Sequence, residues 1–100
     1  MNKVESSSVK KRLHLAGVGD VVLIDCNIAP CSEPARNVYL LNMEDDVVWQ
    51  IETGFSSHGV VGYSDIYCGP NNELMAYSSN GVEYEIDRAS GNILGKELIR

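Results

Sequence analysis

Acidic side chains gather at two places in this sequence of 100 residues. Glu83, Glu85 and Asp87 alternate with apolar residues, so on a β-strand they would share one face, with about 7 Å between neighbours. The second group is a run of three acids, Glu44, Asp45 and Asp46. Carboxylates this close repel one another unless water or a cation screens them, and together they attract basic proteins. The two groups therefore predict a surface that binds a basic protein. The alternative is that they only keep an outer face or an edge in solution.

Few side chains have the types and spacing that catalysis needs. His58 lies in Ser56-Ser57-His58-Gly59, where a nucleophile and a base are neighbours, but adjacent residues rarely present both side chains to one substrate. His14 alternates with apolar residues and is expected to face solvent. No P-loop, EF-hand or zincin pattern occurs. We therefore expect no catalytic residue, no cofactor and no metal site, and keep a small hydrolase built around His58 as a third functional class.

The cysteines are three in number, Cys26, Cys31 and Cys68, without a CxxC pair. This pattern fits neither a disulfide framework nor a zinc ribbon. Reduced thiols are the expectation. The alternative is a bridge between Cys26 and Cys31, or a metal site that adds His14 or His58.

Composition excludes several classes of protein. With 44% apolar and 22% charged residues the chain is too hydrophobic for a disordered protein. Its net charge of −6 argues against binding to nucleic acid or to an anionic membrane. The body of the chain is more acidic still, since Leu13 to Arg100 carries 4 basic residues against 13 acidic ones. No apolar leader or membrane-spanning run occurs, so we expect a cytoplasmic protein.

Short runs of Val, Ile, Tyr and Leu, broken by turn residues every 8 to 12 positions, predict antiparallel strands. Gly17-Val18-Gly19 and Asn80-Gly81 are expected to form tight hairpin turns. The Pro-containing stretch 27–34 is expected to be a loop, and 53–62 a hinge between two halves. The predicted strands are Lys11–Ala16, Asp20–Asp25, Asn37–Met43, Val47–Glu52, Tyr63–Tyr67, Glu73–Ser78, Val82–Asp87 and Ile93–Ile99. The chain is therefore predicted to be one all-β domain, residues 1–100.

Alternation along these strands predicts which side chains are inside. The expected core residues are Val21, Leu23, Val38, Leu40, Leu74, Ala76, Val82, Tyr84 and Ile86. Four further apolar residues make their strands apolar on both faces, as in central strands or an interface; they are Val22, Ile24, Tyr39 and Leu41. Aromatic residues often anchor interfaces, and the candidates are Trp49, Tyr39, Tyr63, Tyr67 and Tyr77.

The two halves of the sequence, about 11–52 and 63–99, resemble each other. Tyr39-Leu40-Leu41-Asn42 aligns with Tyr84-Glu85-Ile86-Asp87 at an offset of 45 residues, and Val47-Val48 aligns with Ile93-Leu94 at an offset of 46. A period of about 45 residues that holds four strands is the size of a propeller blade.

The segment from Tyr84 to Leu94 resembles the quinoprotein-like β-propeller repeats. The resemblance rests on a Tyr-containing strand that ends in Asp87, followed by the Ser90-Gly91 turn and a further strand. The first half departs from it, because acids replace the small-residue turn, although Trp49 stands where many such blades carry a tryptophan. The resemblance implies blade-like sheets and does not extend to the cofactor of those propellers. Because two blades cannot close a propeller, we expect two four-stranded sheets packed as a sandwich or a partial propeller.

By type, being short, acidic and free of catalytic motifs, the chain also looks like the small immunity proteins of bacterial contact-dependent toxin systems. That resemblance implies an inhibitor that covers the active site of a basic toxin domain, with an RNase as the expected target. The expected partner-binding residues are Glu44, Asp45, Asp46, Trp49, Glu83, Glu85 and Asp87. The alternative is a propeller-like scaffold or ligand-sensing module that self-associates through its sheet edges.

Overall fold

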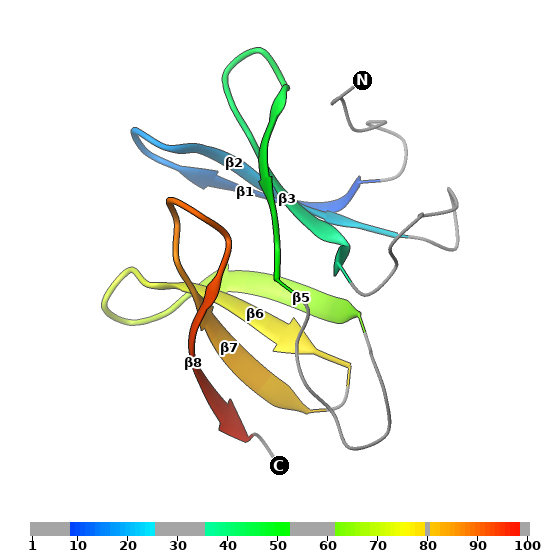
Figure 1. The fold of residues 1–100 in the computed structure, drawn as a ribbon, viewed down its shortest axis with the longest axis vertical. Coiled ribbons are helices and arrows are strands. Elements are labelled where there is room, and N and C mark those ends of the chain that lie inside the picture. Colours follow the sequence, from blue (N-terminus) through cyan, green and yellow to red (C-terminus); the bar gives the residue numbers. More distant parts are fainter. Residues whose placement is uncertain (1–8, 26–35, 53–61, 80, 99–100) are drawn as a thin grey trace.

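In the part of the chain that the structure describes, the protein is all-β, with eight antiparallel strands in two four-stranded sheets (Figure 1). A computed structural model describes residues 9–25, 36–52, 62–79 and 81–98, with side chains up to residue 95. The first sheet contains β1 (Val9–Leu15), β2 (Gly19–Ile24), β3 (Val38–Leu41) and β4 (Val47–Gln50). The second sheet contains β5 (Tyr63–Cys68), β6 (Leu74–Ser78), β7 (Val82–Ile86) and β8 (Ile93–Leu98).

All eight predicted strands are present, and no end differs from its prediction by more than two residues. The stretch 27–34 and most of the predicted hinge at 53–62 lie outside the described residues. Within the described ranges, no helix is long and apolar enough to cross a membrane.

The predicted glycine turn between β1 and β2 is present and needs glycine for two reasons. Gly17 has a φ of 77° and Gly19 a φ of 143°, which only glycine adopts without strain. A Cβ on Gly19 would also lie 2.3 Å from the carbonyl oxygen of Leu41. The turn therefore fixes the register of the first hairpin and lets β3 pack closely beside it. Of the predicted turn at Asn80-Gly81, only Gly81 is described, and its φ is 87°.

The main core lies between the two sheets. It contains eight of the nine predicted residues, with the ninth, Val82, packed against it, and it also includes Leu15, Trp49, Ile51, Tyr63 and Ile66. Alternate side chains of both sheets, among them Val21, Leu40, Leu74 and Ile86, are at most 2% exposed there. Tyr84 packs its ring edge-on against Tyr63, with ring centroids 5.9 Å apart. A second apolar cluster covers the outer face of the first sheet and contains Val22, Ile24 and Leu41, with Tyr39 packed against it. The central strands β2 and β3 are therefore largely buried on both faces, as their apolar runs predict, whereas His14 of β1 and Val48 of β4 are exposed.

Asn37 joins the two sheets where their edges meet. Its side-chain amide donates to the carbonyl oxygens of Ile24 (3.2 Å) and Tyr63 (2.9 Å), and its Oδ1 accepts from the Tyr63 backbone N–H at 2.9 Å. Nearby, the Tyr63 hydroxyl donates to the carbonyl oxygen of Glu52 at 2.7 Å, and burial raises the pKa of Tyr63 above its ordinary value, so this donor stays protonated. The buried Asn37 amide thus makes hydrogen bonds to the Tyr63 backbone of the kind that a neighbouring strand would make.

The two sheets are stacked in the same orientation, so that equivalent faces of the two repeats point the same way. Leu41 lies on the outer face of the first sheet, whereas Ile86, its counterpart 45 residues later, lies on the inner face of the second sheet. Both side chains therefore point in the same direction along the stack. In this arrangement the outer face of the second sheet is the side on which another sheet would be added.

Candidate functional site

The outer face of the second sheet presents acidic and aromatic side chains together. Opposite residues on antiparallel strands share a face, with Cβ atoms about 5 Å apart. The registers of β5, β6 and β7 form two rows of three residues each on this face. The resulting surface, which we call the acidic face, consists of Asp65, Tyr67, Met75, Tyr77, Glu83 and Glu85. All six side chains are at least partly exposed.

In the first row, Tyr77 lies opposite both Asp65 and Glu83. Asp65 is engaged by the first sheet, because the Lys11 ammonium lies 2.8 Å from its Oδ1, in a pair whose side chains are 41% and 48% exposed. Such an exposed pair contributes little to stability, but it offsets the charge of Asp65. The Glu83 side chain makes no hydrogen bond or ion pair within the described part of the chain. Its charge is therefore available to a partner.

In the second row, Met75 lies opposite both Tyr67 and Glu85, and Gly95 lies opposite Glu85 on the other side. A Cβ on Gly95 would have no atom within 4 Å, so the surface next to Glu85 is open. By the repeat offsets, Glu85 and Gly95 are the counterparts of Leu40 and Trp49.

Leu40 and Trp49 are cross-strand neighbours on the inner face of the first sheet and pack in the main core. The second sheet thus has a carboxylate and a glycine at the positions where the first sheet packs a leucine and a tryptophan against its neighbour. This replacement ends the stack of sheets and leaves the acidic face to solvent.

Asp87, the last residue of the predicted acidic stripe, has a different role. It follows the end of β7, and its Oδ1 accepts from the backbone N–H of Ala89 at 2.9 Å. Its own backbone N–H and C=O bond to Asn92 and Gly91 at 2.8 Å. The carboxylate therefore closes the β7–β8 turn, an Asx arrangement that favours this residue type, and the extension of the stripe to Asp87 is corrected to a stripe of two, Glu83 and Glu85.

Trp49 is not a surface anchor, and this corrects the sequence-based interpretation. Its side chain is 6% exposed, and its indole Nε1 donates to the carbonyl oxygen of Arg88 at 2.7 Å. Tyr63 is similarly buried, at 4% exposure. Alternation could not separate these aromatic residues from the partly exposed ones, because both faces of the strands carry large side chains. Tyr67 and Tyr77 of the acidic face remain partly exposed candidates, as does Tyr39 on the first sheet.

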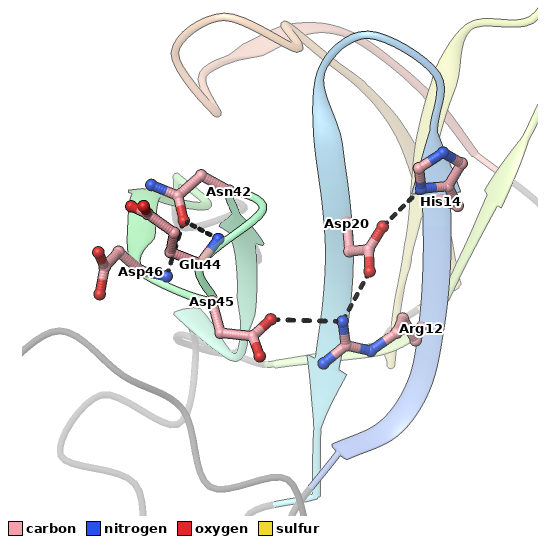
Figure 2. A network of polar contacts seen from close by, with 7 residues as sticks. All are labelled: Arg12, His14, Asp20, Asn42, Glu44, Asp45 and Asp46. Atoms are coloured by element: carbon pink, nitrogen blue, oxygen red, sulfur yellow. Dashed lines mark hydrogen bonds and ion pairs between the residues drawn. The ribbon is translucent and has the colours of Figure 1, made fainter.

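The second predicted acidic group, Glu44 to Asp46, forms the turn between β3 and β4, and Asn42 organises it (Figure 2). The Asn42 Oδ1 accepts from the backbone N–H groups of Glu44 (2.9 Å) and Asp46 (3.0 Å). Asp45 adopts a left-handed φ of 64°, which Asp and Asn tolerate better than most residues. The turn holds its carboxylates away from the acidic face, on the other sheet, so the structure does not unite the two acidic groups in one surface.

A polar network connects this turn to the first hairpin. Asp20 on β2 binds two side chains of β1: its Oδ1 lies 2.7 Å from His14 Nδ1, and its Oδ2 lies 2.6 Å from Arg12 Nη1. The same Arg12 nitrogen lies 3.7 Å from Asp45 Oδ1 across the gap between the hairpins (Figure 2). The hydrogen bonds from His14 and Arg12 hold the pKa of Asp20 below its usual value of 3.8.

This shift predicts how Asp20 contributes to stability at different pH values. Because the folded-state pKa is depressed, ionised Asp20 stabilises the fold above about pH 4, and the contribution is lost as pH falls through the folded pKa. We expect the difference in unfolding free energy between the wild type and Asp20→Asn to shrink as pH falls from 5 to 2. Carboxyl NMR titration should give Asp20 a pKa below 3.8. A titration midpoint at or above that value would contradict the network.

Sequence reasoning missed Arg12, Asp20 and Asn42, although signals for them were present. The glycine turn sets a register that places His14 opposite Asp20, so the pair could be found from the turn. Asn42 precedes a short acidic turn, a position where its side chain often caps backbone N–H groups. The contact of Arg12 with Asp45 depends on how the two hairpins lie in space, and no local pattern encodes it.

The remaining chemistry-bearing residues form no further cluster in the described part of the chain. No three His, Cys, Asp or Glu side chains there are grouped so that they could hold a metal ion. His14 is 75% exposed, as predicted, and Cys68 is an exposed free thiol. Cys26, Cys31 and His58 lie outside the described residues, so the alternatives that involve them stay predictions.

Comparison with known proteins identifies one family. A family model described as "Domain of unknown function (DUF7957)" matches residues 4–98. Neither the curated proteins nor the solved structures contain a match to the chain.

Proposed function

The chain belongs to the DUF7957 family, and we propose that it is an immunity or inhibitor protein that binds a basic protein partner through the acidic face. The partner class is a bacterial toxin domain, with an RNase as the expected example, whose basic active-site cleft the acidic face covers. The chain acts in the cytoplasm, where such a toxin reaches its substrate. In this function the protein performs no chemistry of its own.

The observation that carries the proposal is the composition of the acidic face. Glu83 and Glu85 occupy positions where the repeat has Val38 and Leu40. They lie beside Tyr77 and Met75 on a sheet face against which no other strand of the described ranges packs. Carboxylates steer a basic partner, while tyrosine and methionine supply contact area at low entropic cost. A surface that only solubilises the domain would need the acids but not the partly exposed aromatic residues.

Two alternatives make different predictions. Terminal repeats need a polar outer face for solubility, so the first alternative is that the acids only cap the sheet. Changing the charge of Glu83 and Glu85 would then have no effect on partner binding.

The second alternative, self-association, is favoured by β8, which pairs only with β7 among the described strands. Stacking two acidic faces would oppose like charges, so a homo-oligomer would have to form through such edges. A concentration-independent monomer of about 11 kDa in sedimentation would exclude it.

We expect Glu83→Lys/Glu85→Lys to lower affinity for the partner by about a hundredfold, since unpaired like charges in an interface cost several kcal/mol. The partner is first identified by affinity capture from the native host with the wild-type chain, and then purified. Binding kinetics of the pair at increasing salt should show a 1:1 complex whose association rate falls steeply. Co-expression should show that the wild-type chain, and not the variant, protects cells from the partner.

Two milder variants control for net charge. Glu83→Gln/Glu85→Gln removes two negative charges from the face, and Val48→Lys/Ala89→Lys adds two positive charges at exposed positions outside it. Both variants change the net charge by the same amount, so a general charge effect would slow association equally in both. If the acidic face binds the partner, only the first variant should slow association. Equal effects of the two, or an affinity that Glu83→Lys/Glu85→Lys leaves unchanged, would show that the acidic face is not the binding surface.

A further inference from the structure

The strand β8 contains a glycine, Gly95, that the fold does not require. Gly95 is not one of the described glycines with a positive φ, so other residues can adopt its backbone conformation. A Cβ at this position would have no atom within 4 Å, so close packing does not exclude a side chain. Glycine inside a strand weakens the strand, because it loses more conformational entropy on folding and has no side chain to pack. No conformation or contact of the described residues therefore accounts for a glycine here.

The irregular pairing of β7 with β8 does not require glycine either. Leu94 is an extra residue of β8 between two of its pairs with β7, as in a β-bulge. The first sheet has the same irregularity at the equivalent place, where Val48 is the extra residue of β4. The next residue along the chain is Trp49 in β4 and Gly95 in β8. Since the first sheet forms this bulge with a tryptophan, the second sheet has no structural need for a glycine in its own.

Solubility also leaves the choice of glycine unexplained. A tryptophan exposed in place of Gly95 would promote aggregation, but a threonine would remove that hazard and would favour the strand more than glycine does. What glycine alone provides is uncovered backbone, which lets another chain approach closely. The position is therefore suited to a side chain that comes from a partner.

The side chains around Gly95 define what can bind there. Glu85 lies directly opposite Gly95 on β7, and Met75 lies opposite Glu85 on β6. We call the open space over Gly95 and beside these two side chains the Gly95 site. The Glu85 side chain is exposed and makes no hydrogen bond or ion pair within the described part of the chain, whereas the charge of Asp65 is offset by Lys11. Met75 is partly exposed and adds apolar surface.

An arginine side chain fits these surroundings. Its guanidinium is planar and binds a carboxylate such as that of Glu85 through two parallel hydrogen bonds. A guanidinium is also less strongly hydrated than an ammonium group, so it can lie against the apolar atoms of Met75. The aliphatic stem of an arginine covers apolar surface while its charged end stays in contact with a polar group, and the bare backbone of Gly95 leaves room for that stem.

We propose that the Gly95 site receives one arginine of the protein partner, whose stem crosses the backbone of Gly95 and whose guanidinium pairs with Glu85 beside Met75. The inference rests on the proposed function, because it takes the partner to be a basic protein that binds the acidic face. It deepens that function by naming one contact at the β8 side of this face and the residue type that the partner supplies. Gly95 is then a specificity-determining position, since a side chain there would close the site.

The test uses the full chain, labelled with ¹⁵N and with ¹³C at the methionine methyl groups, and needs no partner. The probe is a capped peptide, Gly-Thr-Arg-Thr-Gly, and two matched peptides have citrulline or lysine in place of the arginine. Citrulline keeps the shape and removes the charge. We expect the arginine peptide to shift the signals of Glu85, Gly95 and the Met75 methyl group. It should bind about tenfold more tightly than the citrulline peptide and about threefold more tightly than the lysine peptide.

Two pairs of variants place the binding at the Gly95 site. Glu85→Gln should weaken the arginine peptide at least about fivefold, whereas Glu83→Gln, which removes the same charge one row away on the same face, should weaken it less than about twofold. Gly95→Leu should weaken it as much as Glu85→Gln does. Ala89→Leu, which adds a leucine at an exposed position of the β7–β8 turn, should leave the binding unchanged. Gly95→Ala should resist urea at least as well as the wild type, because neither φ nor packing demands glycine.

Several results would overturn the inference. The arginine peptide would shift no signal of the Gly95 site, or the citrulline or lysine peptide would bind as tightly as the arginine peptide. Equal weakening by Glu85→Gln and Glu83→Gln, or wild-type binding by Gly95→Leu, would show that the peptide binds elsewhere on the acidic face. A Gly95→Ala variant that is less stable to urea than the wild type would give the glycine a structural role, and the reason for the site would be lost.

Failure of the Gly95 site is distinguishable from failure of the proposed function. A captured partner that loses affinity for Glu83→Lys/Glu85→Lys, together with a peptide that does not bind the Gly95 site, would support the proposed function and overturn the inference. Peptide binding at the Gly95 site, together with a captured partner that ignores the acidic face, would support an arginine site and contradict the proposed function.

Discussion

Replacing Asn37 by alanine should destabilise the protein by about 3 kcal/mol. Asn37 is 7% exposed and its side chain makes three hydrogen bonds, two that cross to the backbone of Tyr63 in the second sheet and one to the carbonyl oxygen of Ile24 in the first sheet. Each bond contributes about 1 kcal/mol, and a buried backbone group left without a partner costs about 1 to 3 kcal/mol. Since domains of this size are stable by only about 5 to 15 kcal/mol, the loss is a large part of the total.

Urea unfolding of the wild type and three variants measures this effect and assigns its cause. Asn37→Leu fills the same volume without the hydrogen bonds, so it should be destabilised nearly as much as Asn37→Ala if the bonds are responsible. Asn92→Ala is the matched control, because Asn92 is exposed and its loss should change stability by less than about 0.5 kcal/mol. Full stability of Asn37→Leu would mean that the sheets are held by apolar packing alone.

The outcome matters for function because Asn37 positions the second sheet. β5 begins at Tyr63, the residue that Asn37 binds, and β5 contributes Asp65 and Tyr67 to the acidic face. Lys11 reaches Asp65 from β1 of the other sheet at 2.8 Å. A partly loosened contact between the sheets would therefore change the charge balance of the acidic face as well as the stability of the domain.

Local patterns predicted the strands because their causes are local. Alternating Val82, Tyr84 and Ile86 need one buried face whichever sheet covers them, and the glycine turn demands a positive φ from Gly17 whatever lies nearby. The double-sided apolar run at Val22 and Ile24 likewise predicts burial on both faces, and the structure confirms it.

The candidate site was predicted less completely because its residues meet through tertiary packing. Glu83 and Glu85 were identified from alternation, but Met75 became a neighbour of Glu85 only through the register of β6 and β7. A groove lined by Val18 and Met43 exists because two separate hairpins end side by side, so these residues gave no joint signal in the sequence. Asp87 has the same residue type as a solvent-facing acid, and only its hydrogen bonds show that it closes a turn.

The repeat also explains why the two halves differ in function. Where the first sheet packs Leu40 and Trp49 against its neighbour, the second has Glu85 and Gly95. Identical halves would expose a leucine and a tryptophan on the final sheet, a surface that would promote aggregation. The divergence removes that hazard and at the same time creates the negatively charged surface that the proposed function uses.

Trp49 provides the second prediction with a large effect, because the sequence assigned it to the partner and the structure assigns it to the core. Its ring packs so closely on Gly91 that a Cβ there would lie 2.5 Å from Trp49 Cε3, and its indole N–H is bonded to the Arg88 carbonyl. Trp49→Ala should therefore destabilise the domain by about 4 kcal/mol, as for other buried tryptophans. Trp49→Phe, which keeps part of the ring and loses the hydrogen bond, should cost about half as much.

The two assignments of Trp49 differ in what fluorescence will show. It is the only tryptophan of the chain, so emission of the folded protein should be blue-shifted, move to longer wavelength on unfolding, and change little when the partner binds to the acidic face. Gly91→Ala should be destabilised too, since Gly91 has a φ of 79° and no room for a methyl group. A surface anchor would behave in the opposite way: Trp49→Ala would keep its stability and lose the partner, and the emission would shift on binding. Because stability and affinity are measured separately, each assignment can fail on its own evidence.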